Sequence, residues 1–224
     1  MINCIFSLLV LLSVIMPAQL AAAEPENKEI TALEKQLSAD PDNCSLLLKL
    51  GRAYHDLAAA GSDDMLEKAE NIFEKLIKLQ PKNGEARCWY GSTLTIKGRE
   101  AWMPVSKARY VNNGLKEMDK AVELDPNNVS IRMIRGSNSL SLPDFFDRAP
   151  TAVMDFEYLT KLIEKSPNSF DPDYCAGVYL KLGLAYKKMD KMQKARTSWE
   201  KAAAASENSQ AAKEALQLLE KTKE

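Results

Sequence analysis

The chain has 224 residues, and its 30 lysines and arginines nearly balance its 31 aspartates and glutamates. This balance argues against nucleic acid as a partner, because a protein that neutralises phosphates needs a basic surface. Glycine is scarce, with nine residues, whereas alanine, leucine, lysine and glutamate are abundant. Such a composition favours helices throughout.

The first segment has the pattern of a secretory signal peptide. An apolar block at 5–16 is followed by Pro17 and by small residues that end at Ala23. Signal peptidase cleaves after a short apolar block closed by an Ala-x-Ala site, so we predict a signal peptide at 1–23 and an exported, periplasmic domain at 24–224. No Lys or Arg precedes the block, which leaves an uncleaved anchor as the alternative; only then would the chain associate with a membrane.

Helical periodicity follows this segment. Ile30, Leu33 and Leu37 recur at helical spacing before Pro41, which predicts one unpaired helix. The next segment, 44–81, predicts two helices, the first with a glycine and an aromatic residue and the second with a small residue, an aromatic residue and a final proline. These are Gly51, Tyr54, Ala69, Phe73 and Pro81.

Related arrangements recur at 85–126, 130–167 and 175–206, with non-aromatic residues at the aromatic positions of the first two segments and no final proline in the last. In the first three helix pairs, the small position of the second helix and its final proline are twelve residues apart: 69 to 81, 114 to 126, and 155 to 167. Proline cannot continue a helix, so equal intervals indicate equivalent second helices. The third pair is the weakest match, because Arg135 and Asp155 replace apolar or small residues.

The fourth pair carries a whole repeat without insertion. Its key residues are Gly183, Tyr186, Ala195, Trp199 and Ala202. Their spacing is that of the tetratricopeptide repeat (TPR), and the chain from 44 to 206 resembles the TPR superfamily. The resemblance implies an all-α, right-handed solenoid of about four helical hairpins, in which the first helix of each hairpin lines a concave face.

A final helix is expected to cap this solenoid. The segment 209–222 places Ala212, Ala215, Leu216 and Leu219 at helical spacing, with charged residues opposite them. A terminal helix of this kind covers the last apolar face of a repeat stack.

The first three helix pairs are longer than the fourth. Nine positions separate Tyr186 from Ala195, and the equivalent turns of the first three pairs carry insertions of six, eleven and seven residues. Insertions at equivalent turns project from one edge of a solenoid. The second insertion contains Trp102, and the third contains Phe145 and Phe146. Either these aromatic side chains fold back and extend the core, or they form an exposed apolar rim that binds a partner.

The inward positions of the four pairs predict a second binding surface. The TPR resemblance places there Arg52, His55, Ser92, Thr95, Met133, Ser137, Leu184 and Lys187. Chaperone-binding TPRs hold a carboxylate with Lys and Asn, whereas this sequence has Leu48 and Arg52 at the first such pair, so no carboxylate clamp is expected. A mixed groove suits an extended or helical peptide.

No arrangement of residues predicts catalysis, a cofactor or a metal site. His55 is the only histidine and has Asp56 beside it, which makes neither a catalytic triad nor a metal cluster. Cys44, Cys88 and Cys175 have no metal or redox spacing; we expect buried thiols, with a Cys44–Cys88 disulfide as the alternative.

Together these patterns predict an exported scaffold, not an enzyme, that binds a protein or peptide partner in the cell envelope. The alternative is a periplasmic accessory subunit of a transporter, in which the aromatic insertions close over a small apolar ligand. An enclosed cavity of roughly several hundred Å³ would favour the ligand carrier, and an open apolar patch would favour the scaffold.

Overall fold

The computed structural model describes the backbone of residues 18–222 and the side chains of residues 28–222. In this part of the chain the secondary structure is entirely helical. The α-helices are α1 (Ala18–Ala39), α2 (Cys44–Ala59), α3 (Asp63–Leu79), α4 (Gly84–Glu100), α5 (Pro104–Leu124), α6 (Val129–Ser141), α7 (Ala149–Lys165), α8 (Pro172–Lys188), α9 (Met192–Ala205) and α10 (Gln210–Lys221). Two short 3₁₀ helices, η1 (Asp144–Phe146) and η2 (Pro167–Ser169), lie in the connections.

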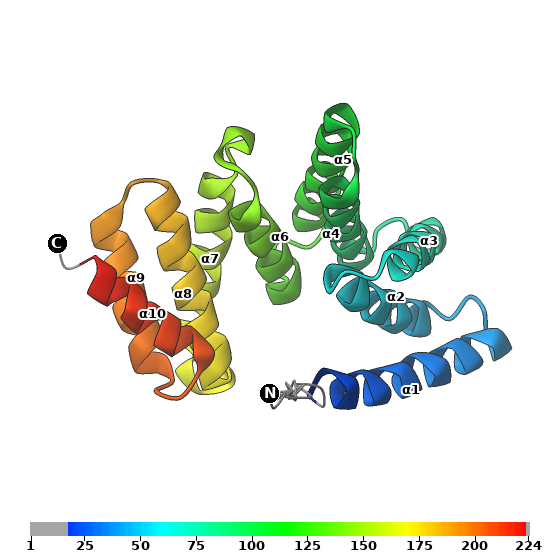
Figure 1. Ribbon diagram of the computed structural model, residues 1–224, viewed down its shortest axis with the longest axis horizontal. Helices are drawn as coiled ribbons and strands as arrows, with labels where there is room; N and C mark the ends of the chain where they lie inside the picture. The colour runs from blue at the N-terminus through cyan, green and yellow to red at the C-terminus, as the bar shows by residue number, and fades with distance from the viewer. Residues whose placement is uncertain (1–17, 223–224) are drawn as a thin grey trace, which may run out of the picture.

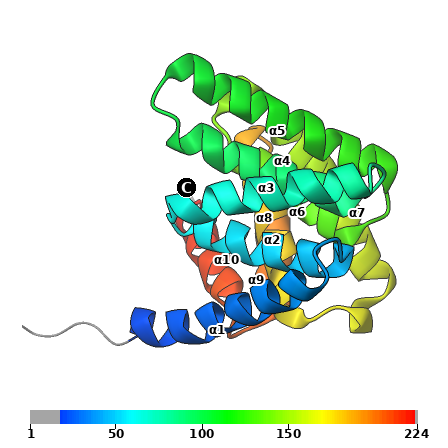
Figure 2. The ribbon, with the colours of Figure 1, turned by 90° about the vertical axis from the view of Figure 1, so that its right-hand side faces the viewer.

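The helices form a curved stack of antiparallel pairs, α2–α3, α4–α5, α6–α7 and α8–α9 (Figures 1 and 2). Helices α2, α4 and α6 lie on the inner side of the curve, and α3 and α5 lie outside them (Figure 1). Helix α1 packs against α2 at one end, and α10 packs against α8 and α9 at the other. The predicted all-α helical-repeat solenoid is therefore confirmed.

Local signals explain where the helices begin. Asn43, Asn83 and Asn128 are the N-cap residues of α2, α4 and α6. Each side-chain oxygen accepts a hydrogen bond from the backbone N–H three residues later, at 3.1, 2.9 and 3.1 Å. A proline stands two positions before each of these asparagines and cannot continue the preceding helix. The Pro-x-Asn sequence therefore ends one pair and starts the next.

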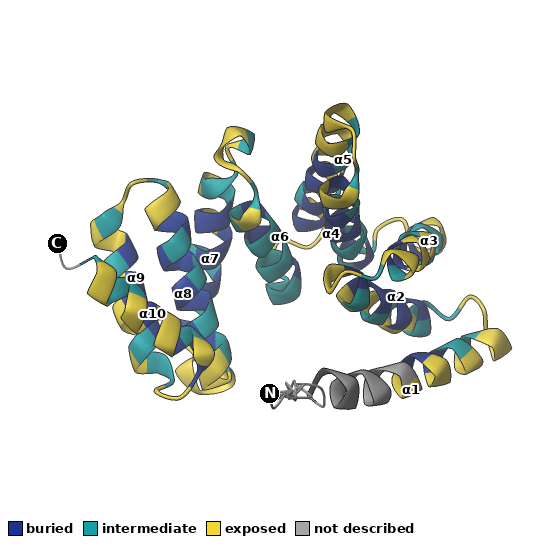
Figure 3. Ribbon diagram, viewed as in Figure 1, coloured by how far each residue is buried: buried dark blue, intermediate teal, exposed yellow. Residues whose placement is uncertain are grey.

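Close contacts between paired helices depend on glycine. A Cβ atom on Gly91 of α4 would lie 2.5 Å from the carbonyl oxygen of Gly114 on α5. A Cβ atom on Gly183 of α8 would lie 2.3 Å from Nε1 of Trp199 on α9. Both distances are below contact distance, so the paired helices approach this closely only because no side chain stands between them. Buried residues accordingly gather between the paired helices (Figure 3).

The three insertions differ in secondary structure. Most of the first two insertions is helical, so that α4 and α5 are 17 and 21 residues long and only residues 101–103 connect them. Pro104 is the first residue of α5, where its fixed φ favours a helix start. Only the third insertion is mainly irregular, at 142–148 with the short helix η1. The lengthened α4–α5 hairpin rises at the upper edge of the stack in Figure 1.

The two ends of the stack are covered by helices with small or aliphatic inner faces. Ile30 and Leu33 of α1 are buried, as are Ala212 and Ala215 of α10. The prediction was wrong for Leu216, which is 55 % exposed. The buried stripe of α10 runs through positions 212, 215 and 219, and a residue directly after 215 points about 100° away from it.

The signal-peptide prediction is largely outside the described residues, since its apolar block at 5–16 precedes Ala18. Within residues 18–222, no helix has the length and apolar character needed to cross a membrane. Cys44, Cys88 and Cys175 are all free thiols, so the alternative of a Cys44–Cys88 disulfide is wrong. Burial raises the pKa of the Cys88 thiol well above its ordinary value.

Candidate functional site

Three of the predicted groove residues join one hydrogen-bonded network on the inner side of the stack. His55 of α2 is buried, and its Nε2 lies 2.8 Å from Oγ of Ser92 on α4. Asn138 of α6 donates from Nδ2 to the same Ser92 oxygen at 3.2 Å. Thr95 donates from Oγ1 to Oδ1 of Asn138 at 2.7 Å. The network links three successive inner helices and makes His55 a structural group.

Arg52 lies on the same helix as His55 and is partly exposed to solvent. Its side chain is 49 % exposed, and its guanidinium lies 5.2 Å from the ring of Trp89. The Trp89 ring also meets His55 edge-on, with 4.8 Å between ring centroids. Nη1 of Arg52 is 3.8 Å from a carboxylate oxygen of Glu85. An arginine held on an aromatic face keeps its donors available to a partner.

The other predicted groove residues are not brought together. Ser137 donates to the sulfur of Met133 at 3.6 Å within α6, and both residues are half-buried. Leu184 of α8 is half-buried and packs on the C-terminal core, whereas Lys187 is exposed. The groove is therefore a polar network at α2, α4 and α6, followed by a more apolar stretch at α8.

The aromatic residues of the insertions divide between the two predicted alternatives. Trp102 is 87 % exposed and Phe145 is 80 % exposed, so neither extends the core. Phe146 is half-buried and packs against the apolar cluster of the second helix pair. Its ring lies 4.5 Å from that of Phe145, between centroids. The exposed ends of both insertions lie at the same edge of the stack (Figure 3).

A pocket of about 680 Å³ lies between these two insertions, and we call it the edge pocket. Its walls come from the lengthened α4–α5 hairpin and from the α6–α7 connection. The apolar lining consists of Ile96, Pro104, Ala108, Val111, Leu142, Pro143, Phe145 and Phe146. Trp102 does not line it. A volume of this size is in the range of ligand and peptide side-chain sites.

Polar groups occupy two levels of the edge pocket. Thr95 and Asn138 line it and also belong to the inner network, so the pocket and the groove share two residues. Arg99 and Lys107 also line it, and both are exposed. Lys107 donates to the backbone oxygen of Arg99 at 3.1 Å. The pocket thus combines apolar walls, a hydrogen-bonding floor and two cations.

The α6–α7 connection is fixed in place from two sides. Nη1 and Nη2 of Arg148 donate to the two carboxylate oxygens of Asp119 on α5, at 3.0 and 2.7 Å. On the other side, Nζ of Lys188 on α8 donates to the backbone oxygen of Leu142 at 2.6 Å. Asp147 adopts a left-handed conformation with φ of 50°, which directs the chain into α7. One wall of the edge pocket is therefore held by charged contacts to both neighbouring helix pairs.

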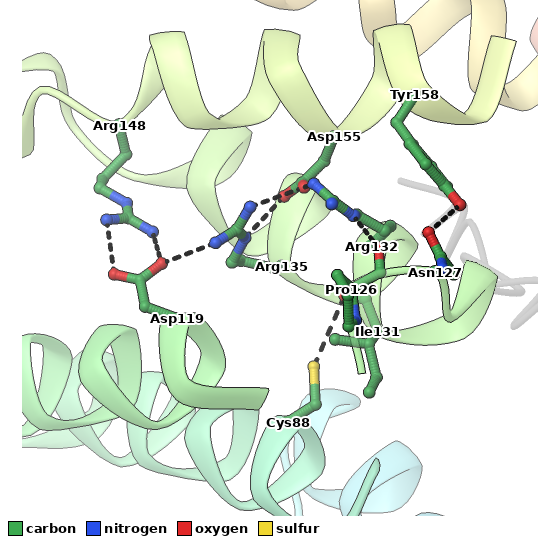
Figure 4. Close-up of polar contacts among 10 residues, drawn as sticks. All are labelled: Cys88, Asp119, Pro126, Asn127, Ile131, Arg132, Arg135, Arg148, Asp155 and Tyr158. Atoms are coloured by element: carbon green, nitrogen blue, oxygen red, sulfur yellow. Dashed lines mark hydrogen bonds and ion pairs between the residues drawn. The ribbon is translucent and has the colours of Figure 1, made fainter. Parts of the chain in front are cut away.

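A buried charge cluster underlies this wall (Figure 4). Asp155 of α7 is completely buried and accepts two bonds from Arg135 of α6, at 2.8 and 2.7 Å. Arg132 donates to Asp155 at 2.9 Å, and Arg135 also donates to Asp119 at 3.1 Å. Burial lowers the pKa of Arg135, but the bonds to Asp155 and its charge outweigh burial, and the pKa lies above its ordinary value.

This cluster explains why the third helix pair departs from the repeat. Arg135 and Asp155 are complementary substitutions, since each supplies the partner that the other needs in the core. Asp119 extends the cluster to α5 and on to Arg148. The sequence shows that both positions depart from the repeat, but their pairing depends on contacts between helices and is visible only in the structure.

Histidine, cysteine, aspartate and glutamate side chains form no group of three that could hold a metal ion among residues 28–222. His55 is occupied by Ser92 and by Asp56, whose Oδ1 lies 3.1 Å from Nδ1.

Comparison with known proteins agrees with this architecture. A family model of the tetratricopeptide repeat matches residues 176–209, within α8 and α9 and the turn after them. No curated protein sequence matches the chain. Among solved structures, a thermophilic TPR protein of Thermus thermophilus aligns with a TM-score of 0.67 and 16 % identity, over 89 % of this chain and 94 % of that chain.

Two further solved structures are similar in fold. A structure of MamA aligns with a TM-score of 0.54 and 21 % identity, over 86 % of this chain and 96 % of its own. YrrB, described as a TPR protein with an unusual peptide-binding site, aligns with a TM-score of 0.53 and 18 % identity, over 89 % of this chain and 87 % of its own. At these identities the similarity establishes the fold alone.

Proposed function

We propose that this chain, which is a tetratricopeptide-repeat protein, is an exported scaffold that binds a protein partner in the cell envelope through the edge pocket. The observation that carries the proposal is the pocket itself, whose apolar walls come from two neighbouring helix pairs. TPR stacks are typically non-catalytic scaffolds, and we assign this chain no catalytic step. The peptide-binding site described for YrrB supports peptide recognition as one use of the fold.

The chemistry of the pocket indicates which peptide would fit. A volume of about 680 Å³ accommodates apolar side chains of an extended or helical segment, which would pack on Phe145 and Phe146. Arg99 and Lys107 would attract a carboxylate beside those side chains. We therefore propose a segment with an apolar anchor and a neighbouring acidic residue as the bound element.

Affinity capture from the native envelope tests the scaffold. Phe146→Ala removes the half-buried ring of the pocket wall, and Leu216→Ala is the control, because Leu216 is an exposed apolar residue on α10 far along the chain. We expect proteins captured by the unaltered chain to be retained by Leu216→Ala and reduced at least tenfold by Phe146→Ala, as for the loss of a central interface residue. Equal capture by both variants would contradict a role for the pocket.

Export rests on the sequence of residues 1–23 and has its own test. We expect the intact mass of the protein isolated from its source to correspond to a chain that starts at Glu24. A mass that starts at Met1 would favour the membrane-anchored alternative.

A small-ligand carrier is a second candidate, favoured by the pocket volume alone. In that case the purified protein would carry an apolar acid in the pocket, held by Lys107 and Arg99. Native mass spectrometry distinguishes the two functions, because a bound small molecule that is lost in Phe146→Ala supports the carrier. A ligand-free spectrum together with selective protein capture supports the scaffold.

A further inference from the structure

The apex of the α4–α5 hairpin carries apolar side chains that the edge pocket does not use. We call residues 101–105 the hairpin tip; of these, Pro104 lines the edge pocket. Trp102 is 87 % exposed, Val105 is 76 % exposed and Met103 is 45 % exposed. The backbone turns here between Glu100, the last residue of α4, and Pro104, the first residue of α5. Three apolar side chains at one protruding turn are more than an isolated exposed residue.

Cations flank the hairpin tip on both helices. Between positions 97 and 109 there are four cations, Lys97, Arg99, Lys107 and Arg109, and one carboxylate, Glu100, which leaves a formal charge of +3. The whole chain has a formal net charge of −1, so positive charge is concentrated at this hairpin.

Two of these four cations have no carboxylate partner among the described residues and are available to an anionic surface. Lys97 pairs with Glu70, and Arg99 pairs with Glu100 at 2.7 Å. Lys107 and Arg109 are exposed, and neither has a carboxylate partner in the described chain. Because α5 rises about 1.5 Å per residue, these two side chains start about 5–8 Å below the first residue of the helix.

The geometry points to the surface of an anionic lipid bilayer as the binding partner of the hairpin tip. Tryptophan concentrates at membrane interfaces, and interfacial segments bury their apolar face about 5–10 Å deep while lysine and arginine contact anionic headgroups. The tip has this order of layers, with Trp102 and Val105 at the apex and Lys107 and Arg109 behind them. This inference goes beyond the proposed partner binding and does not rest on it.

A bilayer fits the tip better than an acidic protein surface does. The apex is convex, and Trp102 does not line the edge pocket, so a protein partner would need a matching hollow for its ring. A fluid interface accepts a protruding ring without a preformed cavity. The neighbouring α6–α7 connection lacks this chemistry, because the exposed Phe145 stands between Asp144 and Asp147.

Co-sedimentation with lipid vesicles tests the inference with the protein as its source produces it. The vesicles consist either of phosphatidylcholine alone or of phosphatidylcholine mixed with phosphatidylglycerol. We expect binding to the mixed vesicles that weakens as salt is raised, because added ions screen the headgroup charge. Binding to neutral vesicles should be much weaker. Failure of the unaltered protein to bind the mixed vesicles would overturn the inference.

Three variants test whether the hairpin tip, and not another exposed apolar segment, binds the vesicles. Trp102→Ser should weaken vesicle binding about tenfold, and Arg109→Glu should weaken it at least about fivefold, since each cation near an anionic surface contributes about that factor. Phe145→Ser, at an aromatic residue that is 80 % exposed and lies beside acidic residues, should bind vesicles like the unaltered protein. All three positions are exposed, and circular dichroism verifies folding. Vesicle binding that is unchanged in Trp102→Ser, or lost in Phe145→Ser, would refute the assignment.

The Trp102 and Arg109 variants keep this test distinct from partner capture, although Lys107 lies both in the edge pocket and behind the hairpin tip. Arg109 and Trp102 do not line the edge pocket, and Phe146 does not belong to the hairpin tip. If Arg109→Glu reduces protein capture while no variant affects vesicle binding, the hairpin tip binds a protein and the bilayer inference is wrong.

Discussion

The third and fourth helix pairs pack their two helices together at equivalent positions, but the fourth pair uses apolar residues there and the third pair uses a buried ion pair. In the fourth pair, Gly183 packs on the indole of Trp199, which is completely buried, and Ala195 occupies the small position of the second helix. In the third pair, Gly136 packs on Phe156, and Asp155 occupies the small position. Asp155 is stabilised there by the two arginines that reach it.

The difference between these two contacts shows how a helix pair can support the wall of a pocket and keep the fold of the repeat. The apolar contact of α8 and α9 is complete within one pair. The charged contact of α6 and α7 continues through Asp119 to α5 and through Arg148 to the connection that forms a wall of the edge pocket. A buried charge network is costly if it is broken, so this wall is held in the position in which Arg135 and Arg148 both reach Asp119.

The largest effect is expected at Asp155. Asp155→Ala leaves Arg135 buried without its main partner, which should lower the free energy of unfolding by about 3–5 kcal/mol. Because a repeat stack is stabilised pair by pair, hydrogen exchange should increase most in α6 and α7. Urea denaturation measures the stability, and Glu123→Ala, at an exposed carboxylate on α5, should change it by less than about 0.5 kcal/mol.

A double variant tests whether the unpaired charge of Arg135 causes the loss of stability in Asp155→Ala. Arg135→Met combined with Asp155→Leu removes both members of the pair and should recover at least half of the loss, because a well-packed apolar pair can replace a buried ion pair. A double variant no more stable than Asp155→Ala would indicate that packing, and not the unpaired charge, is responsible.

A comparable effect is expected from Trp199 in the fourth pair, by a different mechanism. Trp199→Ala creates a cavity between α8 and α9 and should cost about 3–5 kcal/mol. Hydrogen exchange should increase in α8, α9 and α10, while α4 and α5 remain protected. Uniform loss of protection along the whole chain would contradict independent helix pairs.

Two glycines of α8 provide a smaller and internally controlled test. Gly183→Ala places a methyl group 2.3 Å from Nε1 of Trp199 and should destabilise the protein by about 1–3 kcal/mol. A methyl group at Gly177→Ala meets no atom within 4 Å. Since alanine is the better helix former, that change should stabilise the protein by about 0.5–1 kcal/mol. Thermal unfolding of both variants checks the opposite signs; equal signs would show that close helix approach is not the constraint.

The smallest expected effect on folding stability occurs only at alkaline pH. Burial, followed by contacts with Glu164 and Glu157, raises the pKa of Tyr179 and Tyr186 to about 12. In the unfolded chain these phenols titrate at about 10, so between the two values the folded state holds more protons. Stability should therefore be unaffected below the unfolded pKa and fall as pH rises through the folded pKa. Tyr186→Phe should weaken this dependence in urea titrations, and an unchanged slope would argue against its burial.

Much of the fold follows from local sequence. The Pro-x-Asn segments before α2, α4 and α6 end and restart helices through their own backbone and side-chain chemistry. The spacing of Gly183, Ala195 and Trp199 specifies how two adjacent helices pack. Such signals act over a few turns, so the all-α repeat architecture was predictable, whereas the inward placement of His55, Ser92 and Thr95 was expected from the TPR resemblance.

Only the tertiary structure decided which residues form the site. The sequence placed Trp102 and Phe146 in insertions but did not distinguish the exposed ring from the half-buried one. It singled out Asp155 but not its bonds to Arg135, and it did not indicate Asn138 as the link between groove and pocket. These outcomes depend on how long neighbouring helices are and where they cross. Helical periodicity does not encode that geometry, because it records which face of a helix is buried but not which residue of another helix covers it.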